Sequence, residues 1–276
     1  MKWFSFSQDR GAATATLWVC VNLLVQYNGY AVYGSCTPVG ILTEVLERRG
    51  CNVFLYVAAA LIPALLLLTW LYTRDRLHPE PKRLVYRLFL LGAGIVLPAG
   101  LIERGLIETG VGTSHVPLRA TLITAFFVAG MVEEFLKASI VERKALQPGY
   151  MKSPIDCIVY SGAVALGFAA IENILYVTSS GFETAAVRSV TAVPAHFMFG
   201  IIMGTAYAGY LWAGRNKALA YLLPALAHGT YDTFAMSAGL LANVVLIGYL
   251  LGLMALSMVL LRRVTHWSKD LLAARG

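Results

Sequence analysis

Charged residues are scarce in this chain of 276 residues: they make up 13% of it, whereas soluble domains carry about 25%. Hydrophobic residues make up 58%, and the mean hydropathy is +0.67. Several stretches of about 20 residues avoid charge altogether, which is the length a helix needs to cross a hydrocarbon core about 30 Å thick. Strands with alternating polarity are not evident, which argues against a membrane barrel. The composition therefore predicts an all-α, polytopic helical membrane protein.

Several familiar signatures are missing as well. The four cysteines show no CxxC spacing and no histidine at a metal-site interval. A disulfide between Cys36 and Cys51 is compatible with the sequence, but free cysteines are common in apolar segments and we expect free thiols. The sequence has no HExxH, GxSxG, Walker or Rossmann motif, and no Ser or Cys nucleophile stands out. The usual signature of soluble zinc proteases is therefore not available.

Apolar runs divide the chain into candidate membrane spans. We predict seven of them, near residues 53–72, 85–102, 120–140, 156–177, 189–213, 218–236 and 239–261. An eighth segment near 11–33 is compatible with a retained span, a membrane-surface segment or a signal peptide, although no clean cleavage site follows it. No long linker, low-complexity tract or clear repeat appears. We therefore expect seven or eight transmembrane helices, with a membrane domain at 51–276 and an N-terminal extension at 1–50.

The basic residues indicate how these spans are oriented. The net charge of +7 does not point to nucleic acid, because Lys and Arg lie in short loops and not in one domain. Loops 73–87, 142–153 and 213–217 and the tail after 261 hold 14 Lys and Arg residues, whereas the opposite side holds five. The richer side of a membrane protein is usually cytoplasmic. We expect a plasma-membrane protein with its C-terminus in the cytoplasm.

A few ionisable residues lie inside the apolar runs, and four of the predicted spans carry them. They are Glu133, Glu134 and Lys137 in "MVEEFLKASI", Glu172 beside Asn173, His196, and His228 with Asp232. A charged side chain at the centre of an inserted helix costs roughly 2.5–3.5 kcal/mol on insertion scales. Several such groups are too costly to be incidental unless they face one another or water.

Helical geometry allows these groups to converge. At about 100° per residue, Lys137 lies between the two acids on one narrow face, and His228 and Asp232 are i,i+4 neighbours. His196 shares a face with Gly200 and Gly204, whose small size lets another helix approach closely. We therefore predict a shared intramembrane pocket. By residue counting Glu133 lies nearer the cytoplasmic side than Glu172 or His196, a mismatch that tilted or broken helices would remove.

Each group also has a purely structural interpretation. The paired acids and Lys137 are compatible with a self-neutralising cluster at a helix end, and Glu172–Asn173 with an interhelical hydrogen bond. His196 alone is compatible with a satisfied buried histidine, and His228–Asp232 with a structural pair. The functional interpretation depends on all four occurring together.

The set as a whole is suited to activating water. A glutamate held near a lysine and a second acid can act as a general base. Histidines bind metals or donate a hydrogen bond to a developing oxyanion, and Asp232 is spaced to orient His228. A catalytic Zn²⁺ site needs three protein ligands and a water, for which Glu172, His196 and His228 are enough donors.

Together, these motifs resemble those of the PrsW family of polytopic intramembrane proteases. The matching segments are "EEFLK" at 133–137, "GFAAIEN" at 167–173, His196, "HGTYD" at 228–232 and the first-loop segment "LYTRDRLHPEPKRLVYR" at 71–87. The resemblance runs from about residue 53 to 262. The family is distantly similar to the CAAX prenyl endopeptidases and bacteriocin-immunity proteins. There Phe-x3-His stands where this chain has Phe168-x3-Glu172.

The resemblance implies hydrolysis of peptide bonds in membrane-anchored substrates, for example anti-sigma factors in regulated proteolysis. It implies Glu133 as the base that activates water, with Glu134 and Lys137 setting its protonation and orientation. Glu172, His196 and His228 would hold one divalent metal such as Zn²⁺, or the oxyanion, with Asp232 as support. The wider group has been regarded both as metallopeptidases and as glutamate-based enzymes, so both mechanisms remain open.

Two other functions remain open at this stage. A proton- or ion-coupled transporter would also place acids and histidines near the midplane, but would more often show two related halves with broken helices at matching positions. Such halves are not seen, although Pro98, Pro194 and Pro224 could break helices. A non-catalytic scaffold would keep the polar network for packing. The partners we expect are a membrane-anchored protein substrate and the lipid bilayer, with no nucleic acid. The sequence does not give the substrate, the trigger or the oligomeric state.

Overall fold

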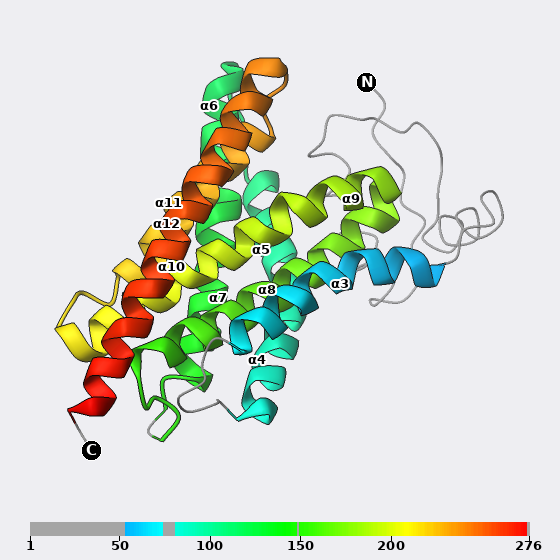
Figure 1. Ribbon diagram of the computed structural model, residues 1–276. Coiled ribbons are helices and arrows are strands. Elements are labelled where there is room, and N and C mark those ends of the chain that lie inside the picture. Colours follow the sequence, from blue (N-terminus) through cyan, green and yellow to red (C-terminus); the bar gives the residue numbers. More distant parts are fainter. Residues whose placement is uncertain (1–52, 74–80, 148, 275–276) are drawn as a thin grey trace.

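The computed structural model describes residues 53–73, 81–147 and 149–274. Across these residues every regular element is a helix and there is no strand, which confirms the predicted all-α fold (Figure 1). The N-terminal extension at 1–50, the segment at 11–33 and the Cys36–Cys51 pair lie outside the described residues. The remaining cysteine, Cys157, is buried, and its thiol donates to Sδ of Met151 at 3.6 Å.

The helices follow one another along the chain with short connections. They are α3 (Val53–Tyr72), α4 (Lys82–Gly94), α5 (Val96–Glu108), α6 (Pro117–Ile123), the π-helix η1 (Thr124–Gly130), α7 (Met131–Lys144), α8 (Pro154–Ser180), α9 (Phe182–Val190), α10 (Ala192–Ala213), α11 (Leu219–Ala235) and α12 (Leu240–Ala273). Each of the seven predicted spans coincides with one of these helices or with a run of two or three that follow directly on one another.

In the described part of the chain, four helical segments are long and apolar enough to cross a membrane. They are Lys82–Glu108, Pro154–Ser180, Phe182–Ala213 and Leu240–Ala273, and the apolar helix Val57–Tyr72 is shorter. Large apolar side chains such as Leu66, Leu240 and Leu251 are exposed on the outer surface. Such side chains are suited to contact with lipid, and the protein is a multi-pass membrane protein.

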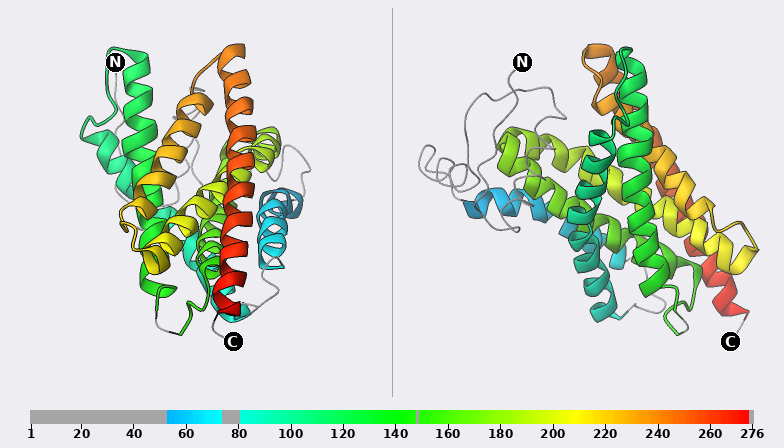
Figure 2. Two further views of the ribbon diagram at one scale, coloured as in Figure 1. Left: turned by 60° about the vertical axis from the view of Figure 1, so that its left-hand side comes forward. Right: turned by 180° about the vertical axis from the view of Figure 1, so that it is seen from behind.

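Helix α8 is the centre of the molecule. It begins at Ser153, whose backbone N–H and hydroxyl donate to the Asp156 carboxylate at 2.8 and 2.7 Å, and Pro154 occupies the first turn. Residues 154–170 are buried without exception, as expected of a helix that is apolar all round. Helices α3, α4 and α10 pack against it. Figure 2 shows, in its right-hand view, that α8 crosses α4–α5 and α6–η1–α7 obliquely.

Glycines let the helices around α8 approach closely. A methyl group at Gly204 of α10 would lie 2.5 Å from Cα of Ile158, and one at Gly167 would lie 1.9 Å from the carbonyl oxygen of Phe89 in α4. Neither distance is tolerated between real atoms, so both positions require glycine. The predicted close approach of another helix to the Gly200–Gly204 face is confirmed, and that helix is α8.

A π-helical segment immediately precedes the paired acids. In η1 the hydrogen bonds skip one more residue than in an α-helix, a rare geometry that occurs mostly at functional sites. It packs against α11: a methyl group at Gly130 would lie 2.9 Å from the carbonyl oxygen of Ala225. The first turn of α7, with Glu133 and Glu134, is thereby brought beside α11, which carries His228.

Helix α12 is longer than a bilayer requires. Its 34 residues extend about 51 Å at 1.5 Å per residue, against a hydrocarbon core about 30 Å thick. Near its end the Ser268 hydroxyl accepts a hydrogen bond from the backbone N–H of Ile155 at 2.9 Å. The last turns of α12 are thus fixed to the first turn of α8.

Candidate active site

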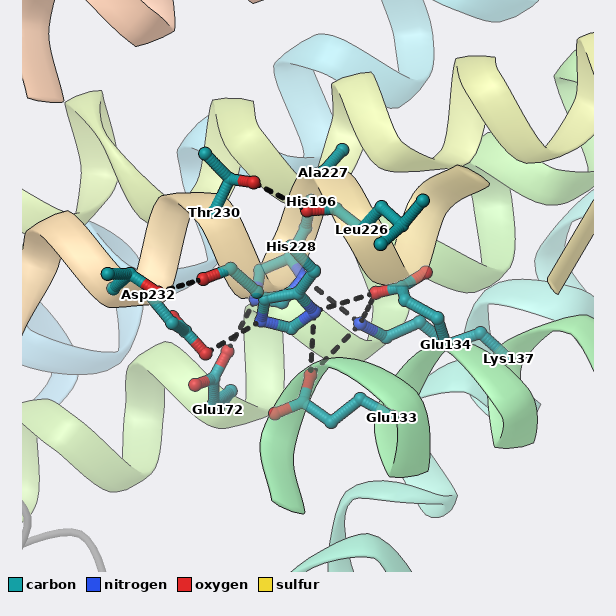
Figure 3. A network of polar contacts seen from close by, with 12 residues as sticks. Glu133, Glu134, Lys137, Glu172, His196, Leu226, Ala227, His228, Thr230 and Asp232 are labelled. Atoms are coloured by element: carbon teal, nitrogen blue, oxygen red, sulfur yellow. Dashed lines mark hydrogen bonds and ion pairs between the residues drawn. The ribbon is translucent and has the colours of Figure 1, made fainter. Parts of the chain in front are cut away.

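Seven ionisable side chains from four helices meet in the interior (Figure 3). They are Glu133, Glu134 and Lys137 of α7, Glu172 of α8, His196 of α10, and His228 and Asp232 of α11. These are the residues that the sequence singled out, and the structure brings all of them together. We call them the polar cluster.

Lys137 lies at the centre of the cluster and is fully buried. Its Nζ donates hydrogen bonds to Glu133 Oε2 at 3.0 Å, Glu134 Oε1 at 2.7 Å and His196 Nδ1 at 3.0 Å. The ring centroid of Phe168 lies 4.0 Å from the same nitrogen, which adds a cation–π contact. One ammonium therefore holds both acids of α7 and one histidine of α10 in fixed positions.

The contacts of His196 determine its tautomer. A lysine ammonium only donates hydrogen bonds, so Nδ1 of His196 must accept, and the ring proton is on Nε2. Nε2 donates to Glu172 Oε2 at 2.8 Å. Glu172 Oε1 in turn pairs with Nη2 of Arg188 at 2.9 Å, and the Arg188 guanidinium lies over the ring of Tyr176. A chain of contacts thus orients His196 with its unprotonated nitrogen toward the Lys137 ammonium, which also holds the acids of α7.

His228 has a matching arrangement. Its Nδ1 lies 3.0 Å from Glu134 Oε1, and its Nε2 lies 3.3 Å from Asp232 Oδ2. The ring stacks on Phe199, with 4.9 Å between centroids, and stands nearly perpendicular to the ring of His196 at 5.0 Å. Each histidine therefore directs one nitrogen toward α7 and the other toward a carboxylate behind it. On the α7 side, His196 contacts Lys137 and His228 contacts Glu134.

A cavity of about 100 Å³ adjoins the cluster, which is room for several water molecules. Glu133, Glu172, His196, His228 and Asp232 line it, whereas Glu134 and Lys137 do not. Of the two acids of α7, then, Glu133 faces the cavity and Glu134 lies behind it.

The donor atoms of the cluster fit a divalent cation. One ligand atom from each of Glu133, Glu134, His196 and His228 lies within 4.8 Å of the others, and all four side chains are buried. Glu134 Oε2 is buried and has no hydrogen-bond partner among the described residues. Histidines that bind a metal commonly donate their other N–H to a carboxylate, as His196 does to Glu172.

The charges in and around the cavity support this fit. Five carboxyl groups, those of Glu103, Glu133, Glu134, Glu172 and Asp232, accompany the two cations Lys137 and Arg188. Buried charges are costly unless they are compensated, so bound protons or a divalent cation would have to balance the excess. The sequence predicted Glu172, His196 and His228 as ligands, whereas the structure groups the two histidines with the acids of α7 and leaves Glu172 behind His196.

Two charged residues of the cavity were not predicted as site residues. They are Arg188 of α9 and Glu103 of α5. A signal for Glu103 is present in the sequence: it lies on the same helical face as Val96, Ala99 and Ile107, at spacings of three and four residues. Val96 and Ala99 are buried, so this face of α5 is directed inward.

Comparisons with known proteins match the range that contains the whole polar cluster. The family described as PrsW family intramembrane metalloprotease matches residues 80–261, about two thirds of the chain. The chain is 38% identical to the Protease PrsW of Oceanobacillus iheyensis over 181 residues, which is 64% of this chain and 80% of that protein. It is 33% identical to the Protease PrsW of Clostridioides difficile over 220 residues, or 76% of this chain and 91% of that protein. No solved structure gives a significant match.

Proposed function

The chain belongs to the PrsW family of intramembrane metalloproteases and is therefore a membrane-embedded peptidase, and from this premise we propose how its polar cluster works. The substrate of such an enzyme is a protein in the membrane. We propose that the cluster hydrolyses a peptide bond of a membrane-anchored protein, as in regulated proteolysis of anti-sigma-factor-like proteins. In this proposal Glu133 is the base that activates water.

The position of Glu133 carries this proposal. Of the paired acids it is the one that lines the cavity, so a water molecule there can reach its carboxylate. Lys137 holds Glu133 Oε2 at 3.0 Å and so limits the orientations of the group. A base must lie within hydrogen-bond reach of the proton it takes, and a fixed carboxylate beside a cavity large enough for water meets that condition.

The histidines take part through their Nδ1 atoms, which face α7, at Lys137 for His196 and at Glu134 for His228. We propose that Glu134, His196 and His228 would hold the divalent ion, with Glu172 and Asp232 orienting the two imidazoles. When bound, such an ion acts as a Lewis acid that polarises the scissile carbonyl. The ammonium of Lys137 already contacts Glu133, Glu134 and His196, and this arrangement supports the alternative, glutamate-based mechanism without a metal. In that mechanism an imidazole N–H stabilises the oxyanion.

The remaining assignments are also proposals. We propose that residues 51–276 form the protease domain and 1–50 an extension to it, which is supported by the family match at 80–261. We further propose that the protein resides in the cell membrane with its C-terminus in the cytoplasm. The distribution of Lys and Arg supports this orientation.

A cleavage assay in membranes tests the role of Glu133. Glu133→Gln keeps the shape of the side chain and removes the base, so we expect turnover of a single-span reporter substrate to fall by about 10²–10⁴-fold. Expression and membrane insertion should not change. Glu142→Gln is the matched control, because Glu142 lies on the same helix and contacts Lys217 and Tyr221, outside the cavity. Undiminished cleavage by Glu133→Gln would remove that residue from the role of base.

A further inference from the structure

Glu103 is the carboxyl group of the cavity that the proposed mechanism leaves without a task. It comes from α5, whose inward face also carries Val96, Ala99 and Ile107. Ile107 lines the cavity one turn further along the same face. The Glu103 side chain therefore lines the same cavity as Glu133, from a helix that supplies no residue of the polar cluster.

In the described part of the chain the Oε1 atom of Glu103 is buried and has no hydrogen-bond partner. The neighbouring cation Arg104 is engaged elsewhere, with its Nε 2.5 Å from Glu108 Oε1. A carboxyl oxygen that is buried without a cation beside it is less costly to bury in the neutral acid, which is also the form that donates a proton. A buried polar atom without a hydrogen-bond partner requires an explanation. One explanation is that an atom of the bound substrate is its partner.

Peptide hydrolysis needs a proton donor as well as a base. The amine leaves readily only if its nitrogen gains a proton while the carbon–nitrogen bond breaks. Glu133 is engaged at that stage with the proton that it took from water. Two carboxyl groups beside one cavity allow the two transfers to be divided between them.

We propose that Glu103 is a second catalytic residue, which donates a proton to the leaving nitrogen of the scissile peptide bond; this rests on the proposed function. Glu133 takes one proton from water, and the water oxygen bonds to the carbonyl carbon. As the carbon–nitrogen bond breaks, its electron pair stays with nitrogen, which accepts the proton of Glu103. The new carboxylic acid returns a proton to Glu103, and Glu133 passes its proton to the free amine. One peptide bond and one water give a carboxylate and an ammonium.

Substrates that differ only in the leaving atom test this role. A single-span substrate with its natural peptide bond is compared with the same substrate carrying an ester at the cleaved bond, since an alkoxide needs less assistance from an acid. For Glu103→Gln we expect kcat on the peptide bond to fall by about 100-fold or more, with ester cleavage within about threefold of the unaltered enzyme. Glu108→Gln is the control, because Glu108 lies on the same helix with its side chain 60% exposed.

The outcomes separate the proposals. Four outcomes would each overturn the role of Glu103. They are an equal loss of activity on the peptide and ester bonds, a loss confined to KM, an undiminished rate on the peptide bond, and an ester that the unaltered enzyme does not cleave. Ester cleavage by the same preparation shows that Glu103→Gln is folded. If that variant does not accumulate, Glu103→Asp keeps the exchangeable proton, and a smaller loss confined to the peptide bond is expected. Glu133→Gln should lose both reactions, so a failure of the proposed function is recognised independently.

Discussion

At the scale of single residues, the cluster depends on one ammonium that touches two acids and an imidazole. Helical periodicity predicts that Lys137 lies between Glu133 and Glu134 on one face of the helix. The structure adds the contact with His196, which comes from a helix some 60 positions later in the chain. That contact fixes the histidine tautomer, with the lone pair of Nδ1 directed at the Lys137 ammonium.

Metal content provides a residue-scale prediction that does not depend on activity. If His196 and His228 bind a divalent ion, protein purified without chelators should contain about one equivalent by elemental analysis. His196→Ala and His228→Ala should each reduce that content, because a site with two neutral nitrogen donors loses one of them. His266→Ala is the control, since His266 is exposed on α12. An active preparation free of metal would favour the glutamate-based mechanism.

The residues of the site were predictable from the sequence where an ionisable side chain lies within an otherwise apolar run. Glu172 and His196 interrupt apolar runs, and the insertion cost of such groups makes each conspicuous. Glu103 and Arg188 are not conspicuous in this way, because each lies near the end of a span where charge is common. Arg188 is distinguished from an ordinary flanking residue only by the packing of α9 around the cavity, whereas Glu103 also shares a helical face with Val96 and Ala99.

At the scale of helices, the contact between α4 and α8 depends on glycine. A methyl group at Gly92 would lie 2.1 Å from the carbonyl oxygen of Val164, whereas one at Gly94, two residues further along α4, meets nothing within 4 Å. The first position faces backbone, which cannot move aside as a flexible side chain can. The two glycines therefore provide a test substitution, at Gly92, and a matched control, at Gly94.

We expect Gly92→Ala to destabilise the protein by about 1–3 kcal/mol or more, the usual cost of overpacking a tight interface. Gly94→Ala should be neutral or slightly stabilising, because alanine is the better helix former. Thermal unfolding in detergent, measured side by side for the two variants, checks both expectations. Equal melting temperatures would show that α4 and α8 adjust more readily than their separation indicates.

The helices themselves were predictable from apolar runs, but their mutual placement was not. Counting residues along straight helices puts Glu133 nearer the cytoplasmic side than Glu172 or His196, yet the structure brings all three into one cluster. Periodicity carries no information on tilt, and α8 lies obliquely across its neighbours (Figure 2). Hydrophobic periodicity also does not reveal the π-helix η1, because the composition of its seven residues suits an ordinary α-helix.

At the scale of the whole molecule, the cavity lies toward one end of the bundle. It is lined by Ile107, Tyr176 and Met236, which lie at or near the ends of α5, α8 and α11. The opposite end is marked by the contact between Ile155 and Ser268, where α8 begins and α12 approaches its end. The cavity is therefore remote from the end of α12.

The charge distribution predicts that a reporter fused to the C-terminus lies in the cytoplasm. Paired reporters, one active only in the cytoplasm and one only outside it, should give signal from the first alone. The cavity would then lie in the outer half of the membrane, and cleavage of a single-span substrate should occur in its outer half as well. Accessibility of the C-terminal reporter from outside would reverse both expectations.

The length of α12, which exceeds the thickness of the hydrocarbon core, has a practical consequence for imaging. A membrane protein of 29.9 kDa gives electron cryo-microscopy few features by which to align its particles. Because Ser268 fixes the last turns of α12 to α8, a helical marker domain joined in continuous register after Ala273 should rotate with the bundle and not independently of it. Such a fusion would provide a fiducial outside the detergent belt, at the end of the molecule remote from the cavity.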